Sequence, residues 1–102
     1  MLDNVDELKK AVEGMHQCTA EFAESVPVNE VFNGRTVWEG IVQVFKLTGH
    51  PSANLCYAWS SPIDGSTKRK FFAVLNIPPV ISAQEAVRAA IVEEYRQKHT
   101  KT

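Results

Sequence analysis

Three strand-like runs between residues 36 and 77 limit most strongly what this chain can fold into. Residues 36–47, 54–60 and 70–77 are rich in valine, isoleucine and aromatic side chains, which are typical of β-strands. Turn-forming residues separate the runs at 49–52 and 64–66. The pattern therefore predicts a sheet of antiparallel strands joined by short connections.

The sequence also allows a fourth, short strand at residues 28–32. It would be followed by Asn33-Gly34, a pair that suits a type I′ hairpin turn because both central residues of that turn have positive φ. Gly40, inside the run 36–47, indicates either a bulge or a close approach to the backbone.

Helical patterns flank the strands at both ends of the chain. Asn4 and Glu7 have the spacing of a capping box, and apolar residues then recur every three or four positions. This pattern predicts an N-terminal helix that ends before Pro27, since the residue before a proline avoids the helical conformation. Ser82 and Glu85 form a second capping box, so a C-terminal helix is expected to begin there.

The chain of 102 residues has the length of one domain, covering residues 1–102. We predict an α+β fold in which an antiparallel three- or four-stranded meander sheet carries the N-terminal and the C-terminal helix on one face. No apolar run approaches the about 20 residues of a membrane-spanning helix, and the acidic N-terminus does not resemble a secretory signal. These features predict a cytoplasmic domain without a membrane partner.

No pattern in the sequence predicts a catalytic residue, a metal site or a cofactor. Cys56 with His50 or His16 could form a thiol–imidazole pair, but nothing brings them together with an orienting group. There is no glycine-rich phosphate loop, and the two cysteines and three histidines lack metal-binding spacing. We expect Cys18 and Cys56 to be free, buried thiols.

The predicted strands are apolar on both faces, although an antiparallel sheet with one wet face should alternate. With both helices on one face, the other face would need a different cover, such as a second copy in a homodimer or a protein partner. Trp38, Tyr57 and Trp59 are the expected anchors, because aromatic side chains dominate interfaces. The leading hypothesis is a non-enzymatic interaction module that self-associates or binds a protein partner through the sheet.

A basic triplet supports a second hypothesis, a nucleic-acid binder; its members are Lys68, Arg69 and Lys70. Two phenylalanines follow, and basic residues beside aromatic ones can hold a nucleic-acid backbone and stack its bases. On an edge strand the same residues would instead discourage pairing with other strands. Residues 1–30 hold seven acidic and two basic residues, whereas residues 31–102 hold nine basic and five acidic ones. Such asymmetry marks either an anion-binding side, to which His50 and Arg88 would belong, or two solvated faces.

Two segments resemble the double-stranded RNA-binding domain. The loop Gly49-His50-Pro51-Ser52 is similar to that family's minor-groove loop, and residues 82–90 are similar to its last helix. The predicted order of helix, three strands and helix resembles it as well. The resemblance implies binding to duplex RNA, but Ala83, Gln84 and Val87 occupy the places of the family's phosphate-binding lysines.

A third hypothesis is a small ligand-binding or enzymatic domain with a pocket between the sheet and the helices. Its first candidates are His50, Cys56 and Asp64, the side chains with the most useful chemistry in the central part of the chain.

Overall fold

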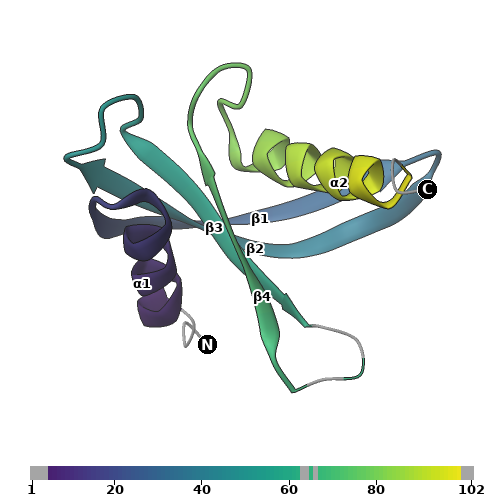
Figure 1. The fold of residues 1–102 in the computed structure, drawn as a ribbon. Coiled ribbons are helices and arrows are strands. Elements are labelled where there is room, and N and C mark those ends of the chain that lie inside the picture. Colours follow the sequence, from purple (N-terminus) through teal and green to yellow (C-terminus); the bar gives the residue numbers. More distant parts are fainter. Residues whose placement is uncertain (1–4, 63–64, 66, 100–102) are drawn as a thin grey trace.

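The computed structural model describes residues 5–62, 65 and 67–99. Its elements are, in order, α1 (Val5–His16), β1 (Thr19–Phe32), β2 (Arg35–Thr48), β3 (Leu55–Pro62), β4 (Arg69–Leu75) and α2 (Ala83–His99) (Figure 1). The strands form one antiparallel meander in the order β1-β2-β3-β4. The α+β meander is therefore confirmed, with four strands. Neither described helix is long and apolar enough to cross a membrane.

The N-terminal helix is shorter than predicted. It ends at His16, and Gln17 leaves the helical conformation with a φ of 52°. The predicted helical stretch up to Pro27 belongs instead to β1, which pairs with β2 from Thr19 to Phe32. The backbone hydrogen bonds between β1 and β2 over this length stabilise the strand. The spacing of the apolar residues that suggested a helix is also compatible with a strand. The capping residue Asn4 lies outside the described residues.

The turn between β1 and β2 has the predicted conformation. Asn33 and Gly34 have φ values of 53° and 74°, both positive as a type I′ turn requires. The strand before this turn is much longer than the predicted 28–32, and it contains Pro27 opposite Ile41. Proline is tolerated there because β1 is an edge strand, where an N–H directed away from the sheet is not needed.

The two helices cover opposite faces of the sheet, so the prediction that both lie on one face was wrong. Tyr57 and Trp59 of β3 pack with α2, whereas the residues between them in the strand, Cys56 and Ala58, pack with α1. Alternate side chains of a strand point to opposite faces, so each helix buries one of them. This arrangement explains why the strands are apolar on both faces.

The C-terminal helix begins at the predicted cap. The Glu85 N–H donates to Ser82 Oγ at 3.2 Å, and Glu85 Oε1 accepts from the Ile81 N–H at 3.0 Å.

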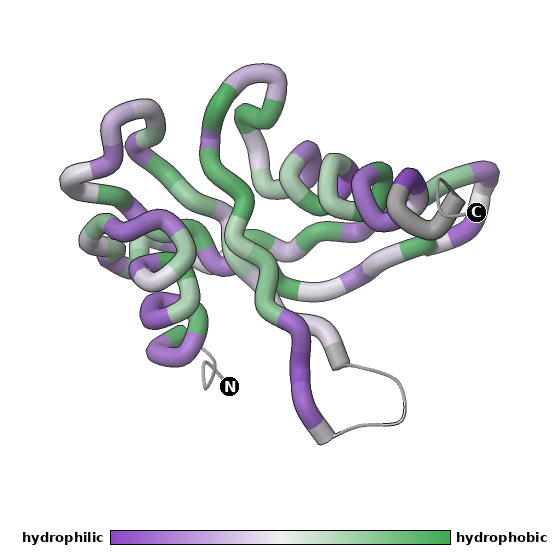
Figure 2. The backbone as a smooth tube through the Cα atoms, viewed as in Figure 1, coloured by the Kyte–Doolittle hydropathy of each residue, from purple (hydrophilic) through white to green (hydrophobic). Residues whose placement is uncertain are grey.

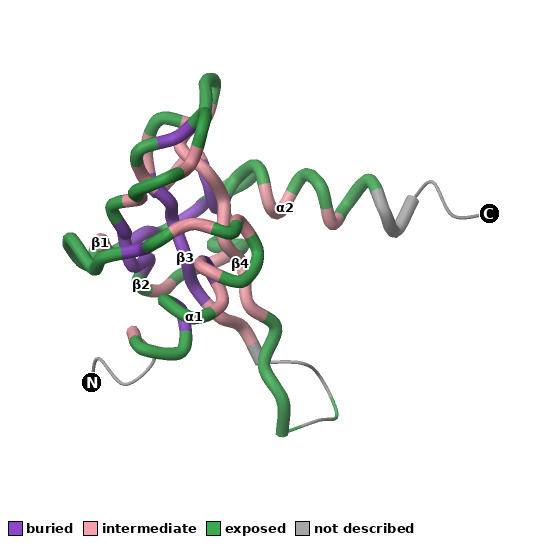
Figure 3. The backbone as a smooth tube through the Cα atoms, turned by 60° about the vertical axis from the view of Figure 1, so that its left-hand side comes forward, coloured by how far each residue is buried: buried purple, intermediate pink, exposed green. Residues whose placement is uncertain are grey.

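The hydrophobic residues along the sheet give way to hydrophilic ones toward the β3–β4 tip (Figure 2). Burial is concentrated where β2 pairs with β3, and much of α2 is exposed beyond this centre (Figure 3).

Candidate functional site

The sheet splits into two hairpins beyond a short central contact. β1 and β2 pair along their whole length, as do β3 and β4, but β2 and β3 pair over only four residues each. The last of these pairs is Gln43 with Ala58. From there the β1–β2 hairpin continues beneath α2, while the β3–β4 hairpin turns away from it (Figure 1). The structure describes no strand in the opening between them.

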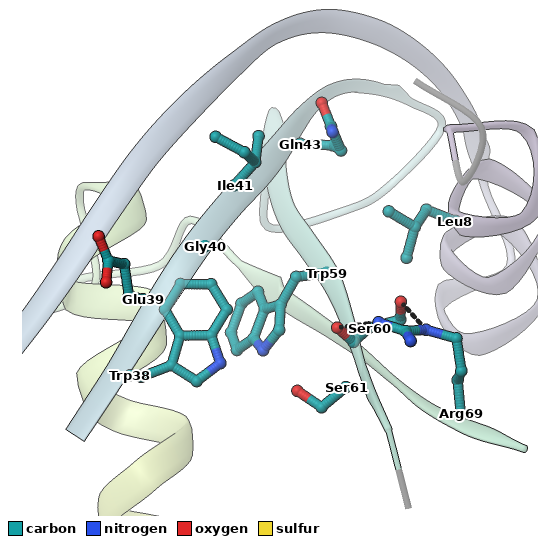
Figure 4. Close-up of a pocket in the computed structure, with 10 residues that line it drawn as sticks. All are labelled: Leu8, Trp38, Glu39, Gly40, Ile41, Gln43, Trp59, Ser60, Ser61 and Arg69. Carbon is teal, nitrogen blue, oxygen red and sulfur yellow. Dashed lines mark hydrogen bonds between the residues drawn. The ribbon is translucent and has the colours of Figure 1, made fainter. Parts of the chain in front are cut away.

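A cleft of about 320 Å³ occupies this opening (Figure 4). This volume is at the lower end of the roughly 300–1,000 Å³ that is usual for ligand pockets. The lining comes from the two diverging strands, from β4 and from α1, and comprises Leu8, Trp38, Glu39, Gly40, Ile41, Gln43, Trp59, Ser60, Ser61 and Arg69.

An aromatic wall forms one side of the cleft. The indoles of Trp38 and Trp59 meet edge to face, with ring centroids 5.9 Å apart, and Trp59 stacks on Phe72 at 5.1 Å. Gly40 makes room for this wall, because a Cβ on it would lie 2.9 Å from the Trp38 ring. The expected close approach at Gly40 is therefore confirmed, whereas the irregularities of the β1–β2 register lie elsewhere, at Phe22/Glu24 and Glu30/Val31.

A hydrogen bond outside the ladder shows which backbone groups of β2 face the cleft. The Leu47 N–H donates to the carbonyl of Asn54 at 2.8 Å, so the backbone groups of Leu47 point toward β3. In an antiparallel sheet every second residue points its N–H and C=O to the same side. The backbone groups of Ile41 and Glu39 therefore also point away from β1, into the cleft.

The same reasoning applies to β3. The Leu55 carbonyl accepts from the Asn76 N–H at 2.9 Å, which places the groups of Leu55 on the side of β4. Neighbouring residues of a strand point their backbone groups to opposite sides. Ser60 follows Leu55 by five residues, so its N–H and C=O point toward the cleft. The Arg69 guanidinium binds this residue, with Nε donating to Ser60 Oγ at 2.8 Å and Nη2 to the Ser60 carbonyl at 3.1 Å. Figure 4 shows these bonds at the rim of the cleft.

Two charged side chains line the cleft, Arg69 and Glu39. Arg69 bonds only to neutral groups of Ser60 among the described residues. Glu39, also exposed, lies on the opposite wall, on β2. Gln43 is almost fully buried and accepts a hydrogen bond from Ser25 Oγ, which fixes its amide at the closed end of the split.

Three of the predicted site residues meet in the cleft, namely Trp38, Trp59 and Arg69. Tyr57 is buried in the core under α2, and its hydroxyl accepts from Asn76 Nδ2 at 2.6 Å. Lys70 pairs with Glu94 of α2 at 3.1 Å, and its ammonium lies 5.1 Å from the Phe72 ring centroid. Lys68 is exposed just before β4.

His50 has a structural role in the loop between β2 and β3. Its Nδ1 accepts from the backbone N–H groups of Ser52 at 3.0 Å and Ala53 at 3.1 Å. This loop precedes β3, whereas the basic triplet follows it, so the strand separates His50 from Arg69 by about 25 Å at 3.3 Å per residue. The residues of the nucleic-acid hypothesis are therefore not gathered on one surface.

The candidates for an enzymatic pocket are not assembled either. Cys56 is fully buried under α1, and this burial, with a smaller contribution from Cys18, raises the pKa of its thiol to about 12. A thiol that stays protonated is a poor nucleophile. Asp64 lies outside the described residues. Within the described part of the chain, no group of three or more histidine, cysteine or acidic side chains could hold a metal ion.

Sequence reasoning missed an ion pair that attaches α2 to β1 and joins a buried carboxylate to an exposed arginine. Glu30 is only 6% exposed and accepts from Arg88 Nε at 2.8 Å and from Gln84 Nε2. The hydrogen bond from Arg88 is the main reason why the pKa of Glu30 is lowered. Arg88, proposed for nucleic-acid binding, is therefore engaged within the fold.

Other cleft residues were missed as well, because they depend on where the two hairpins diverge. Gly40 carried a local signal, since it follows Trp38 by two residues and so shares its strand face.

Comparison with protein-family models, with curated proteins and with solved structures finds no match.

Proposed function

We propose that this protein is a non-enzymatic interaction module that binds a partner protein at the cleft between its two hairpins. One observation carries the proposal: β2 and β3 stop pairing at Gln43 and Ala58, and the opening is lined by Trp38, Trp59 and Arg69. Tryptophan and arginine are the side chains most enriched among residues that dominate binding energy.

The two-sided apolarity of the strands no longer argues for a second copy of the chain, because α1 and α2 already cover one face each. Exposed apolar side chains do remain on the β1–β2 hairpin, including Phe32, Val37 and Ile41. Ile41 also lines the cleft. The surface favoured for a partner is therefore the split in the sheet rather than a whole sheet face.

Selection of peptides from a random display library on the immobilised protein tests this function. Binding of the selected peptides can be followed by intrinsic fluorescence, because Trp38 and Trp59 are the chain's two tryptophans and both line the cleft. We expect binding to weaken at least about tenfold in Arg69→Glu, since removing an interface anchor typically costs more than 1 kcal/mol.

Lys46→Glu is the matched control, because Lys46 is an exposed cation on β2 that does not line the cleft. It should bind the same peptides as tightly as the wild type. Failure to select any peptide that distinguishes Arg69→Glu from Lys46→Glu would contradict the proposed site.

A further inference from the structure

We infer that the partner binds as an extended segment that adds a strand to the open edge of β2, antiparallel to it, beside Glu39 and Ile41. This inference rests on the proposed function and names the class of ligand for the same cleft. Addition of a strand to a sheet edge is a common way to recognise peptides, in which main-chain hydrogen bonds provide affinity and side-chain pockets provide specificity.

The direction of the backbone groups on the open edge of β2 favours strand addition. Glu39 and Ile41 point their N–H and C=O groups into the cleft, on the side where β3 no longer pairs. Across the opening, the carbonyl of Ser60 is already bonded by Arg69. The backbone groups of β2 are therefore the ones available to an incoming strand, which would take the orientation that β3 has where it pairs with β2.

The outer and inner edges of the sheet differ in the features that block strand pairing. The outer strand β1 carries Pro27, an extra unpaired residue between Phe22 and Glu24, and the exposed acids Glu21 and Glu24, all of which oppose strand pairing. The outer strand β4 begins with Arg69 and Lys70. By comparison, residues 38–42 of β2, which follow the unpaired Val37, contain no proline, a single charge and mostly β-forming side chains. The inner edge thus lacks the features that block pairing.

Charge complementarity favours a segment that carries a carboxylate. At the rim of the cleft, Arg69 bonds only to neutral groups among the described residues. Its guanidinium therefore suits a carboxylate of an incoming segment. Trp38 and Trp59 offer an aromatic wall on one side of the segment, and Ile41 an apolar contact on the other. The ligand is therefore an extended, largely apolar segment with an acidic residue near Arg69.

A peptide selected as above can be compared with an analogue in which alternate backbone nitrogens are methylated. Methylation removes backbone donors but leaves every side chain in place. We expect the analogue to bind at least about tenfold more weakly, since several hydrogen bonds of about 0.5–1.5 kcal/mol are lost. In the wild-type protein the amides of Glu39 and Ile41 should become protected from hydrogen exchange when the parent peptide binds.

Two substitutions at one position test the protein side of these hydrogen bonds. Ile41→Pro removes one donor that faces the cleft, and Pro27, its partner in the register, shows that proline fits this ladder where the N–H faces outward. We expect Ile41→Pro to bind more weakly than Ile41→Val, which also changes the side chain but keeps the backbone N–H. If Ile41→Pro does not fold, the exchange measurement on the wild type decides.

The outcomes separate the inference from the function on which it rests. Equal affinity of the methylated analogue, together with unprotected amides of Glu39 and Ile41, would overturn strand addition while leaving the cleft as the binding site. Peptides that ignore Arg69→Glu would overturn the proposed function itself. Light scattering that shows a dimer, with the amides of Glu39 and Ile41 protected without peptide, would assign the edge to a second copy and overturn the partner segment.

Discussion

Gly40 shows how one residue shapes the cleft. A strand glycine usually weakens a sheet, but here its missing Cβ leaves space for the Trp38 indole, which then meets Trp59. Any side chain at this position must displace the ring that forms one wall of the site.

Replacement of Gly40 by alanine should therefore disturb the aromatic wall. The added Cβ would lie 2.9 Å from the Trp38 ring, so we expect a changed tryptophan emission spectrum and a loss of about 1–3 kcal/mol in the free energy of unfolding. Gly14→Ala is the control, because no atom lies within 4 Å of its added Cβ and alanine favours the helix by about 1 kcal/mol. An unchanged spectrum in Gly40→Ala would show that the ring does not depend on the glycine.

Glu30 should make stability depend on pH. Its carboxylate is stabilised in the folded protein, chiefly by Arg88, so its pKa lies below the ordinary value of 4.5. The contribution is then complete above about pH 4.5 and is lost as the pH falls through the folded-state pKa.

Urea unfolding of the wild type and of Glu30→Gln at several pH values measures this contribution, because glutamine keeps the size of the side chain but does not titrate. We expect the wild type to be the more stable protein at pH 7 and the difference between the two to shrink in acid. A difference that does not change with pH would contradict the lowered pKa.

At the scale of elements, one turn and one cap identified from local sequence are confirmed. Asn33-Gly34 and Ser82 with Glu85 were correctly identified because each depends on contacts a few residues away. The end of α1 was misplaced because β1 is stabilised by its pairing with β2, a contact between residues distant in sequence.

Ser82→Ala should destabilise α2 through the loss of its N-cap. The Ser82 hydroxyl accepts the Glu85 N–H, and removing such a cap costs about 0.5–2 kcal/mol. Thermal unfolding should show a lower midpoint for this variant. Ser52→Ala, in an exposed loop, should unfold like the wild type, and equal midpoints for all three proteins would argue against the cap.

At the scale of the whole molecule, the placement of the helices on opposite faces changes the meaning of the apolar strands. The sequence predicted an uncovered sheet face that needed a partner, whereas α1 and α2 cover one face each. The candidate site accordingly lies where the sheet splits rather than on a bare face.

Three valine-to-alanine substitutions test this arrangement. Val12 of α1 and Val87 of α2 are each at most 1% exposed, whereas Val92 of α2 is 44% exposed. Because truncation of a buried aliphatic side chain costs its transfer free energy and leaves a cavity, we expect Val12→Ala and Val87→Ala each to lose about 1–3 kcal/mol. Chemical unfolding should show Val92→Ala close to the wild type. A neutral Val12→Ala would mean that α1 does not cover the second face.

The sequence by itself determined the three strands that follow Gly34, the Asn33-Gly34 turn and the Ser82 cap, because periodicity and local hydrogen bonding decide these features. It also marked Trp38, Trp59 and Arg69 as candidates. Only the tertiary structure decided that these three residues share a cleft and that Tyr57 and His50 do not join them. That outcome depends on where β2 and β3 stop pairing and on which face each helix takes. Both are set by packing between distant segments, which a local pattern does not encode.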